Sequence, residues 1–467
     1  MSEPRRRASG DDTSSTSDAS GAAKKSSAPT GRAAARRAAS AQVAPASATP
    51  ATPLQQVVRH RRRPGGSRFA ITGLKLVAGA LAVVLVSGAS IAGVYTWRIS
   101  STISNNDVDI SNGDNNTVAE PPQYGAFDGG FNVLAVGADN IAGQDAAFGE
   151  RDAELNDVNI LLHVSADHTS ATVVSFPRDL VIPGPACTDP ETGDEYSAVS
   201  AQPLNSSYGR GGLGCVVATI SELTGLDIPY AGLFTFGGTV AMSDAVGGVP
   251  ICLEEAIEDP YSGLDLPEGV SVVQGQQALA YLRSRHGVGD GGDLSRISSQ
   301  QAYMSSMMRV MKSDATLSNP SKILGLANAA AENVILSNTL SPLPTMVSLA
   351  LTLKDLDLDN MTFVTFPTVE NPSDVNKLIP SETLAEELVT KLQNDQPIKL
   401  DENALRDGSV VTADEGTVDP AVPTDAATDP ATGLPTETAT ADPSADVVAG
   451  LQGQSAAQET CSAAFGS

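Results

Sequence analysis

An uncharged apolar run at residues 76–97 limits the possible architectures of this 467-residue chain more than any other feature. As a helix, rising about 1.5 Å per residue, the run would be roughly 33 Å long, which is close to the hydrocarbon thickness of a bilayer. A chain with such a run is divided into a part before the membrane and a part after it. We therefore expect a transmembrane helix within residues 71–98.

Charge is distributed unequally on the two sides of this run. Residues 1–70 hold thirteen Lys or Arg and four Asp or Glu, whereas the rest of the chain holds 16 basic and 51 acidic residues. Basic residues from Arg59 to Lys75 come directly before the run, and Tyr95 and Trp97 mark its other end, so the positive-inside rule places the N-terminus in the cytoplasm. We expect a single-pass protein of the cell membrane with an extracytoplasmic C-terminal domain.

A cleaved signal peptide is the alternative explanation of the run. Ser87, Gly88 and Ala89 would supply the small residues of a cleavage site. The segment before the run is far longer than the charged leader of a signal peptide, however, so we favour a retained anchor.

The segments outside the central domain have compositions typical of unfolded chain. Residues 1–70, rich in Ala, Ser, Thr, Pro and Arg, predict a disordered basic cytoplasmic tail. This tail sets the topology or touches anionic membrane lipid, and we expect no nucleic-acid partner. Residues 99–128 predict an extracytoplasmic spacer, and residues 396–467 predict a low-complexity acidic tail that ends in a cysteine-containing segment.

Residues 129–395 alternate between strand-like and helix-like patterns, which predicts an α/β domain with helices covering a central sheet. The predicted strands are residues 131–136, 158–164, 171–176, 249–253 and 361–366, of which the second and third form a hairpin. The predicted helices are residues 215–223, 238–245, 274–282, 294–312, 321–335, 344–353 and 382–392. Met304 and Met308 lie on one stripe of the fourth helix and suit either the core or a channel for a long isoprenoid.

The four cysteines all follow the apolar run, where an oxidising compartment would permit pairing. An even number favours two disulfides, and three connectivities are possible. We favour Cys187 with Cys215, which flank one loop, and Cys252 with Cys461, which would tie the end of the chain to the domain. Metal binding by these cysteines is not expected, because no CxxC spacing occurs.

Arginine and aspartate gather in two stretches of the domain. Arg178 and Asp179 follow a predicted strand, where side chains emerge from the edge of a sheet into a crevice. The second stretch places further charged and polar side chains around the start of a helix: Arg283, Arg285, Asp293, Arg296 and Gln300. Several guanidinium groups beside carboxylates suit a substrate that carries phosphate, because their planar N–H donors match phosphate oxygens in pairs.

Each of these residues also has a simpler explanation. Arg178 and Asp179 can form a surface ion pair of little energetic value. The two arginines at the end of the preceding helix complement its dipole. Asp293 can serve as the N-cap of the next helix, and Asp157 can be a turn residue rather than a metal ligand or base.

Two further patterns carry little catalytic meaning. Residues 209–214 satisfy the spacing GxGxxG, but no buried strand precedes them, as a dinucleotide site requires. They predict a glycine-rich turn into a helix, which either only turns the chain tightly or aims backbone N–H groups at an anion. His163 is alone in an apolar strand and is expected to be packed and hydrogen-bonded rather than catalytic.

Seven blocks between residues 131 and 392 together resemble the LytR-CpsA-Psr family of bacterial cell-envelope proteins. They are Asn132-Val133-Leu134-Ala135-Val136-Gly137, Asp157 with its strand, Ser175-Phe176-Pro177-Arg178-Asp179, Leu204-Asn205-Ser206-Ser207-Tyr208-Gly209, Asp244-Ala245-Val246-Gly247-Gly248-Val249, Gly275 with Ala278-Leu279-Ala280-Tyr281, and Arg283-Ser284-Arg285 with Asp293, Arg296, Gln300 and Gln301. The cysteine pattern looks like that of actinobacterial members.

The resemblance implies a three-layer α/β/α domain with a central mixed sheet, preceded by one transmembrane helix. It also implies a phosphotransferase that attaches a glycopolymer from a polyprenyl-pyrophosphate carrier to peptidoglycan through a phosphodiester bond. By matching motif, the residues that would bind the pyrophosphate are Arg178, Arg283, Arg285, Arg296 and Gln300. Asp157 and Asp293 would coordinate Mg²⁺ or Mn²⁺ or orient the acceptor hydroxyl, and with Arg178 they would form the catalytic set.

This chain departs from the family pattern at two places. Many members have Arg-Ser-Asp where this chain has Leu155-Asn156-Asp157, so an arginine is missing unless Arg151 replaces it. Many also have Arg-Gln-Gln where this chain has Ser299-Gln300-Gln301. Both departures remove positive charge, which leaves two other functions open: a non-catalytic polyprenyl-phosphate-binding scaffold for wall assembly, and a pyrophosphatase that cleaves the lipid carrier with water.

Overall fold

The computed structural model describes the chain in separate stretches. They are residue 90 and residues 93–94, 97–98, 100–103, 107–111, 129–139, 154–190, 192–313, 320–401, 403–405, 409–411 and 447–466. The predicted cytoplasmic tail lies outside these stretches, as do most of the predicted transmembrane helix, spacer and acidic tail. Within the stretches, no helix combines the length and the apolar character that crossing a bilayer requires. All elements below belong to the compact unit 75–467.

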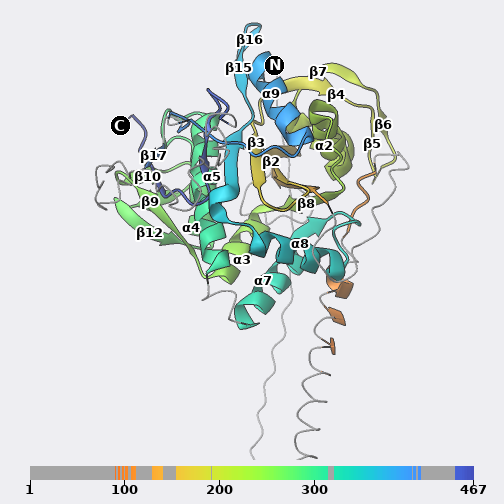
Figure 1. The fold of residues 1–467 in the computed structure, drawn as a ribbon, viewed down its shortest axis with the longest axis horizontal. Coiled ribbons are helices and arrows are strands. Elements are labelled where there is room, and N and C mark those ends of the chain that lie inside the picture. Colours follow the sequence, from red (N-terminus) through yellow and green to blue (C-terminus); the bar gives the residue numbers. More distant parts are fainter. Residues whose placement is uncertain are drawn as a thin grey trace, which may run out of the picture. The chain divides into compact units, whose positions relative to one another are not determined.

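A seven-stranded mixed sheet forms the centre of this unit (Figure 1). In spatial order its strands are β13 (Val334–Leu336), β8 (Tyr230–Phe234), β1 (Phe131–Asp139), β2 (Leu155–Val164), β3 (Ala171–Phe176), β14 (Met361–Thr365) and β18 (Gly453–Ser455). β1 runs parallel to β8 and β3 parallel to β14, whereas the other neighbours are antiparallel. The predictions of a mixed α/β domain and of a hairpin formed by β2 and β3 are confirmed.

Helices cover both faces of the sheet, because its central strands present apolar side chains on both. The described helices are α2 (Tyr208–Thr224), α3 (Phe236–Val246), α4 (Gln276–Arg283), α5 (Asp293–Lys312), α7 (Pro320–Asn333), α8 (Leu343–Asp355) and α9 (Glu382–Gln393). Successive strand residues point to opposite faces. Leu134 of β1 packs in one core cluster with residues of α2 and α9, and Val133 packs in another with residues of α7 and α8. The result is an α/β/α layering around the sheet.

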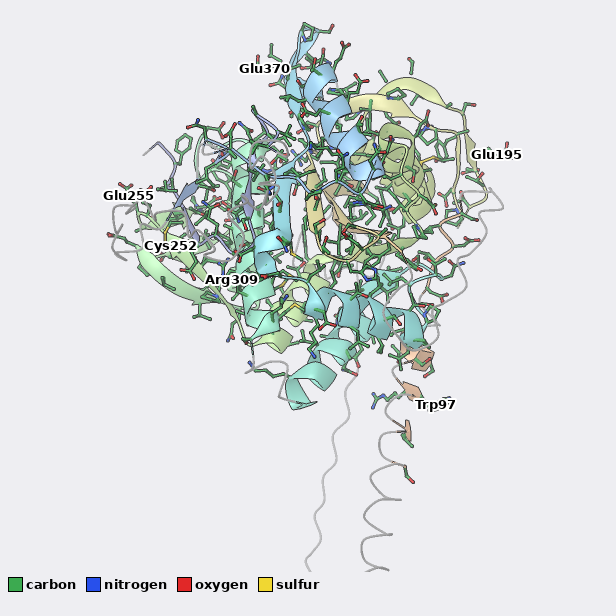
Figure 2. The ribbon with its side chains drawn as sticks, viewed as in Figure 1. Trp97, Glu195, Cys252, Glu255, Arg309 and Glu370 are labelled. Atoms are coloured by element: carbon green, nitrogen blue, oxygen red, sulfur yellow. A yellow bond between two sulfur atoms is a disulfide. The ribbon has the colours of Figure 1, made fainter. Side chains whose placement is uncertain are left out.

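A smaller four-stranded sheet packs beside α5 and has a core of its own. Its order is β12 (Gly269–Val273), β9 (Val249–Leu253), β19 (Thr460–Ser462) and β17 (Ser409–Val411). Leu253 and Tyr281 are buried in its apolar cluster. Cys252 on this sheet and Arg309 on α5 line one shallow hollow, and both are labelled in Figure 2. The strand predicted at residues 249–253 is therefore present, but it belongs to the smaller sheet.

Short paired strands and turns complete the fold. The pairs are β4 (Val181–Gly184) with β7 (Val199–Pro203), β5 (Cys187–Thr188) with β6 (Glu195–Tyr196), β10 (Ile257–Asp259) with β11 (Leu264–Leu266), and β15 (Thr368–Asn371) with β16 (Asp374–Pro380). Two 3₁₀ turns, η2 (Leu204–Ser206) and η3 (Leu358–Asn360), precede α2 and β14. The helix predicted at residues 321–335 ends at Asn333, where the chain continues as β13.

The glycine-rich stretch 209–214 lies inside α2, which begins at Tyr208 rather than at residue 215. The helix kinks there, and Gly212 has a φ of 59°, in the left-handed region that favours glycine. A Cβ added to Gly211 would lie 3.0 Å from the Cβ of Cys187 and 3.1 Å from that of Cys215. The glycines thus let the chain pass close to a disulfide.

The folded unit extends beyond residue 395, where the sequence analysis ended the domain. Within the segment 447–466, β18 pairs with β14 at one end of the large sheet, and β19 pairs with β9 and β17 in the small one. Both strands have three residues and are rich in Gly, Gln, Ser and Thr. So short and polar a stretch has no periodicity that a sequence can reveal.

Candidate active site

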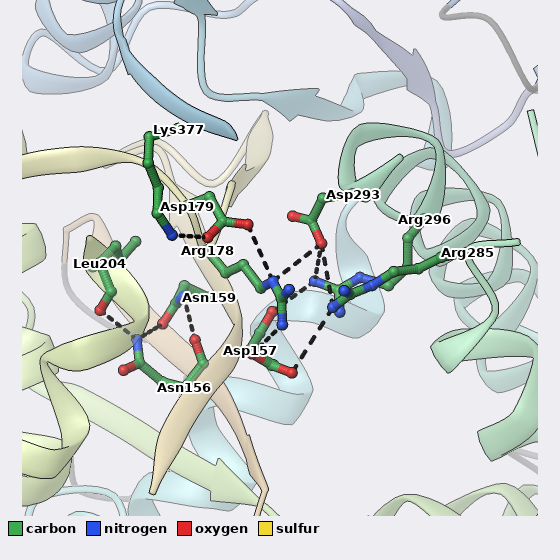
Figure 3. A network of polar contacts seen from close by, with 10 residues as sticks. All are labelled: Asn156, Asp157, Asn159, Arg178, Asp179, Leu204, Arg285, Asp293, Arg296 and Lys377. Carbon is green, nitrogen blue, oxygen red and sulfur yellow. Dashed lines mark hydrogen bonds and ion pairs between the residues drawn. The ribbon is translucent and has the colours of Figure 1, made fainter. Parts of the chain in front are cut away.

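Asp157 and Arg178 come from neighbouring strands at the same end of the central sheet (Figure 3). β2 and β3 are antiparallel, and Asn159 pairs with Phe176. Asp157 lies two residues before the first of these and Arg178 two residues after the second, so the same register places them opposite one another. Their side chains meet, with Nη1 of Arg178 donating to Oδ1 of Asp157 at 2.9 Å.

Asp293 and Arg296 enter the same place from the first turn of α5. The N-cap position is taken by Gly292, and no side chain caps the helix. Asp293 is therefore not the N-cap, and its carboxylate lies one position inside the helix, where the dipole favours negative charge. Nη2 of Arg296, three residues later in the helix, lies 2.8 Å from Oδ1 of Asp293. It also donates to the backbone oxygen of Asp157 at 2.9 Å.

Arg285 reaches the cluster from the loop between α4 and α5. Its Nη2 lies 3.5 Å from Oδ1 of Asp293 and 3.9 Å from Oδ2 of Asp157. Nε of Arg178 lies 3.6 Å from the same oxygen of Asp293. Three guanidinium groups from a strand end, a loop and a helix thus surround two carboxylates, and we call Asp157, Arg178, Arg285, Asp293 and Arg296 the anion-site cluster.

The carboxylate oxygens of Asp293 lack hydrogen-bond donors of good geometry among the described residues. Both of its carboxylate oxygens are buried, and neither accepts a hydrogen bond of good geometry from the described residues, although Oδ1 has cations nearby. A buried carboxylate oxygen with no donor is costly. Such an oxygen is available to a further group, such as a cation or a hydroxyl donor.

Positive charge is in excess within the cluster. Burial, followed by repulsion from Arg296 and Arg178, lowers the pKa of Arg285 to about 10. Arg178 behaves differently, because the attraction of Asp157, Asp293 and Asp179 outweighs its burial and raises its pKa. Arg285 is therefore the cation whose charge is least compensated, and an anion placed beside it would relieve that repulsion.

A family model for the LytR_cpsA_psr family matches residues 94–394, which include the whole anion-site cluster. The chain belongs to the LytR_cpsA_psr family. The resemblance inferred from the seven sequence blocks is thus confirmed.

Curated relatives within the LytR_cpsA_psr family come from several bacteria. The chain is 31% identical to the cell wall biosynthesis protein LcpA of Corynebacterium glutamicum over 270 residues, which cover 52% of this chain and 51% of LcpA. It is 21% identical to the polyisoprenyl-teichoic acid–peptidoglycan teichoic acid transferase TagT of Bacillus subtilis, over 51% of this chain and 70% of TagT. The matched region spans about half the length of the two Corynebacterium relatives.

A solved structure that the chain also matches is the LytR-Csp2A-Psr enzyme from Actinomyces oris. The TM-score is 0.45 and the identity 21%, over 61% of this chain and 94% of the other.

Two predicted site residues have other contacts in the structure. The guanidinium carbon of Arg283 lies 4.4 Å from the centroid of the Phe236 ring, a cation–π geometry. Gln300, one turn after Arg296 on α5, is 6% exposed and donates to the backbone oxygen of Leu282 at 3.0 Å. The structure therefore brings together three of the four predicted arginines through the two aspartates, and it assigns Gln300 a contact with the end of α4.

Lys377 is a neighbour of the cluster that the sequence analysis missed. It belongs to β16 and lies 2.5 Å from Oδ1 of Asp179, whose Oδ2 lies 3.3 Å from Nε of Arg178. The β15–β16 hairpin is thereby connected to the site. The sequence around Lys377 does not indicate this contact, because 198 residues separate Lys377 from Asp179.

Asn156 is a second residue that the sequence analysis did not assign. It is fully buried, and its amide nitrogen donates to Oδ1 of Asn159 at 2.7 Å and to the backbone oxygen of Leu204 at 3.1 Å. Its Oδ1 accepts the backbone N–H of Tyr208 at 3.0 Å. Asn156 therefore ties the start of β2, and with it Asp157, to the beginning of α2. Arg151, the suggested substitute for the missing arginine, lies outside the described residues.

One face of the sheet next to the cluster is incompletely covered. On the α2 side, Leu134 and Leu161 of the two central strands are fully buried. On the opposite side, Val133 and Ile160 remain partly exposed, although both strands have neighbours on either side. Met304 of α5 is likewise only partly buried there. The apolar side chains on this side of the sheet are therefore only partly buried.

The cysteine pairing favoured from the sequence is the pairing in the structure: Cys187 with Cys215, and Cys252 with Cys461. His163 is 6% exposed, and its Nδ1 lies 2.9 Å from Oδ1 of Asn132. Burial lowers the pKa of His163, while Asp395 opposes this change. The expectation of a packed, hydrogen-bonded histidine is confirmed.

Proposed function

We propose that this protein is a phosphotransferase that moves a glycopolymer from a polyprenyl-pyrophosphate carrier to peptidoglycan. The observation that carries the proposal is the convergence of Arg178, Arg285 and Arg296 on two carboxylates at one end of the sheet. Forked N–H donors in a partly buried place suit the oxygens of a diphosphate. The family membership supports this assignment, as does the relative TagT, which is a teichoic acid transferase.

In the proposed reaction, a hydroxyl oxygen of peptidoglycan attacks the phosphorus atom that carries the glycopolymer. The bond from this phosphorus to the bridging oxygen breaks, and polyprenyl phosphate leaves with that oxygen. The proton of the hydroxyl passes to the departing polyprenyl phosphate or to water, and a phosphodiester joins the polymer to the wall. Such reactions need mainly alignment and neutralisation of charge, so they do not require a covalent protein intermediate.

The arginines and the aspartates of the anion-site cluster have different roles in this reaction. The three arginines bind the diphosphate and stabilise the charge that collects on the leaving phosphate. Asp157 is held by Arg178 at one oxygen, and Asp293 keeps a buried oxygen without a donor among the described residues. Either carboxylate is placed to orient the attacking hydroxyl.

The two aspartates also fit a divalent cation. Mg²⁺ prefers oxygen ligands, and proteins usually hold it through one or two carboxylates together with substrate phosphates. Among the described residues no group of three His, Cys, Asp or Glu gathers around one point, so the phosphates would have to supply the other ligands. When bound, Mg²⁺ or Mn²⁺ would neutralise charge on the diphosphate, with Asp157 and Asp293 as its protein ligands.

The lipid part of the carrier would lie on the incompletely covered face of the sheet. Partly exposed Val133 and Ile160 line this face, and Met304 and Met308 border it from α5. Flexible thioethers adapt to an irregular chain such as a polyprenyl tail. Placing the domain outside the cytoplasm is part of the same proposal, and the two disulfides support it, because such bonds persist in oxidising compartments.

Transfer of a labelled lipid-linked polymer to peptidoglycan by the purified protein tests the proposal. Arg178→Ala and Arg285→Ala should each lower the rate by about 10² to 10³, as the loss of a single transition-state donor does elsewhere. Lys354→Ala removes an exposed cation from α8 and should have no effect. Equal rates for the parent and both arginine variants would refute the assignment.

Product analysis separates the alternatives that the sequence left open. Transfer yields polymer linked to the wall, whereas a lipid-linked pyrophosphatase yields free phosphorylated polymer. A wall-assembly scaffold would bind polyprenyl pyrophosphate tightly and release neither product in the presence of Mg²⁺.

A further inference from the structure

The loop 284–292 carries Arg285 and leads directly into Asp293, so its position decides where two members of the anion-site cluster lie. Because Gly287, Gly289, Gly291 and Gly292 all fall within it, the loop has little stiffness of its own. Neighbouring elements must therefore fix its shape.

Asp259, at the end of β10, holds the loop from one side. Its side chain is 1% exposed. Oδ2 accepts hydrogen bonds from Oγ of Ser284 at 2.7 Å and from the backbone N–H of Arg285 at 3.3 Å. Oδ1 accepts the backbone N–H of Tyr261 at 3.0 Å, so one carboxylate joins the loop to the β10–β11 turn.

The ionised carboxylate of Asp259 suits its contacts with the loop. Burial alone raises its pKa, but the hydrogen bonds from Ser284, Tyr261, Ser262 and Arg285 outweigh burial, so the pKa lies below its ordinary value. The carboxylate is therefore ionised at neutral pH, and an ionised carboxylate accepts stronger hydrogen bonds than a neutral group does.

Residues 463–466 hold the loop from the other side. The backbone N–H of Gly289 donates to the oxygen of Ala463 at 3.1 Å, and the N–H of Phe465 donates to the oxygen of Gly287 at 3.2 Å. Val288 and Ala464 form an antiparallel bridge. The ring of Phe465 also packs on Gly291, where an added Cβ would lie 2.8 Å from it.

We propose that Asp259 and residues 463–466 are positioning elements of the anion site, which clamp the loop 284–292 so that Arg285 and Asp293 face Asp157 and Arg178. The inference rests on the proposed function. It goes beyond it by assigning a role at the site to Asp259 and to residues 463–466, of which the latter lie outside the stretch 94–394 that the family model matches. A displacement of about 1 Å in a catalytic group can cost roughly 10²-fold in rate, so a clamp of this kind has a measurable effect.

The first test replaces Asp259 by Asn. An amide has the same shape but turns an NH₂ group toward backbone N–H donors, which must then separate. We expect kcat/KM for polymer transfer to fall about 10- to 100-fold and the Kd for inorganic pyrophosphate to rise. Asp265→Asn, which changes an exposed carboxylate on the same hairpin, is the matched control and should behave as the parent.

The second test ends the chain after Ser462. This variant keeps β18, β19 and the Cys252–Cys461 disulfide, and the residues that it loses include all four that contact the loop, 463–466. We expect parent-like circular dichroism, a retained disulfide by mass spectrometry, and weaker pyrophosphate binding with slower transfer. Parent-like binding and transfer in both variants, each folded, would overturn the clamp.

A parent protein that binds no inorganic pyrophosphate would contradict the proposed function instead, and the contacts of the loop would then be purely structural. Loss of thermal stability with unchanged kinetics at a permissive temperature would also count against the clamp, because a merely structural contact predicts that result.

Discussion

At the residue scale, the cluster shows how a local environment decides what a side chain can do. Asp293 could have been only a helix cap, but Gly292 occupies that position and Asp293 faces three guanidinium groups instead. Arg285 pairs weakly with both aspartates and lies among other cations. Burial, and then this crowding by Arg296 and Arg178, lowers the pKa of Arg285.

Lysine should replace Arg285 poorly, and increasingly so at alkaline pH. The environment lowers the arginine pKa to about 10. The same burial and the same neighbouring cations would lower the pKa of a lysine below its ordinary value of about 10.4. The lysine would therefore begin to lose its proton, and with it the attraction for anions, at a lower pH than the arginine does.

Titration calorimetry with inorganic pyrophosphate from pH 6.5 to pH 9 checks this expectation. Affinity of the Arg285→Lys variant should fall across this range, while that of the parent should stay nearly constant, after allowing for the ionisation of the ligand itself. Parallel pH profiles would mean that Arg285 is less crowded than the structure indicates.

At the element scale, long periodic segments could be predicted and short or glycine-rich ones could not. The helix at residues 382–392 and the strand at 171–176 match α9 and β3 closely, because the apolar residues of α9 follow the helix period and β3 is a short buried apolar run that begins after a turn. The start of α2 was missed, since the glycines that lower helix propensity there serve the passage beside Cys187 and Cys215. Lys377 and Asp259 were missed because their partners are distant in sequence.

Gly211→Ala tests this reading of the kink. The added Cβ would meet the Cβ atoms of both cysteines at about 3 Å, so the disulfide or the helix must shift. We expect a loss of about 1–3 kcal/mol in the free energy of unfolding, as for other overpacked sites. Gly325→Ala, on α7 with no atom within 4 Å of the added Cβ, should be neutral or stabilising by up to about 1 kcal/mol. Denaturant unfolding of both variants gives the comparison.

At the scale of the whole molecule, the two disulfides close loops of very different length. Cys187 and Cys215 are 28 residues apart, whereas Cys252 and Cys461 are 209 apart. The order of the blocks along the sequence was enough to predict the family. The order of the blocks could not show that residues 447–466 complete both sheets, because these strands pair with segments that are far away in the sequence.

Removal of the disulfide that closes the longer loop should destabilise the fold more than removal of the other disulfide. Chain entropy gives about 3.5 kcal/mol for the shorter loop and about 5.5 kcal/mol for the longer one. The double variant Cys252→Ser/Cys461→Ser should therefore unfold at a lower temperature than Cys187→Ser/Cys215→Ser, as measured by scanning calorimetry. The reverse order would show that local strain or residual structure in the unfolded chain dominates.

The pairing of β18 with β14 and of β19 with β9 also has a consequence for folding during translation. Residues 447–466 are translated after the other described strands and after all five residues of the anion-site cluster. Until they emerge, β14 at the edge of the large sheet lacks β18, β9 and β17 of the small sheet are not joined by β19, and the loop 284–292 lacks one of its supports. On the clamp proposed above, a nascent polypeptide that already carries the whole anion-site cluster would bind anions more weakly than the folded protein does.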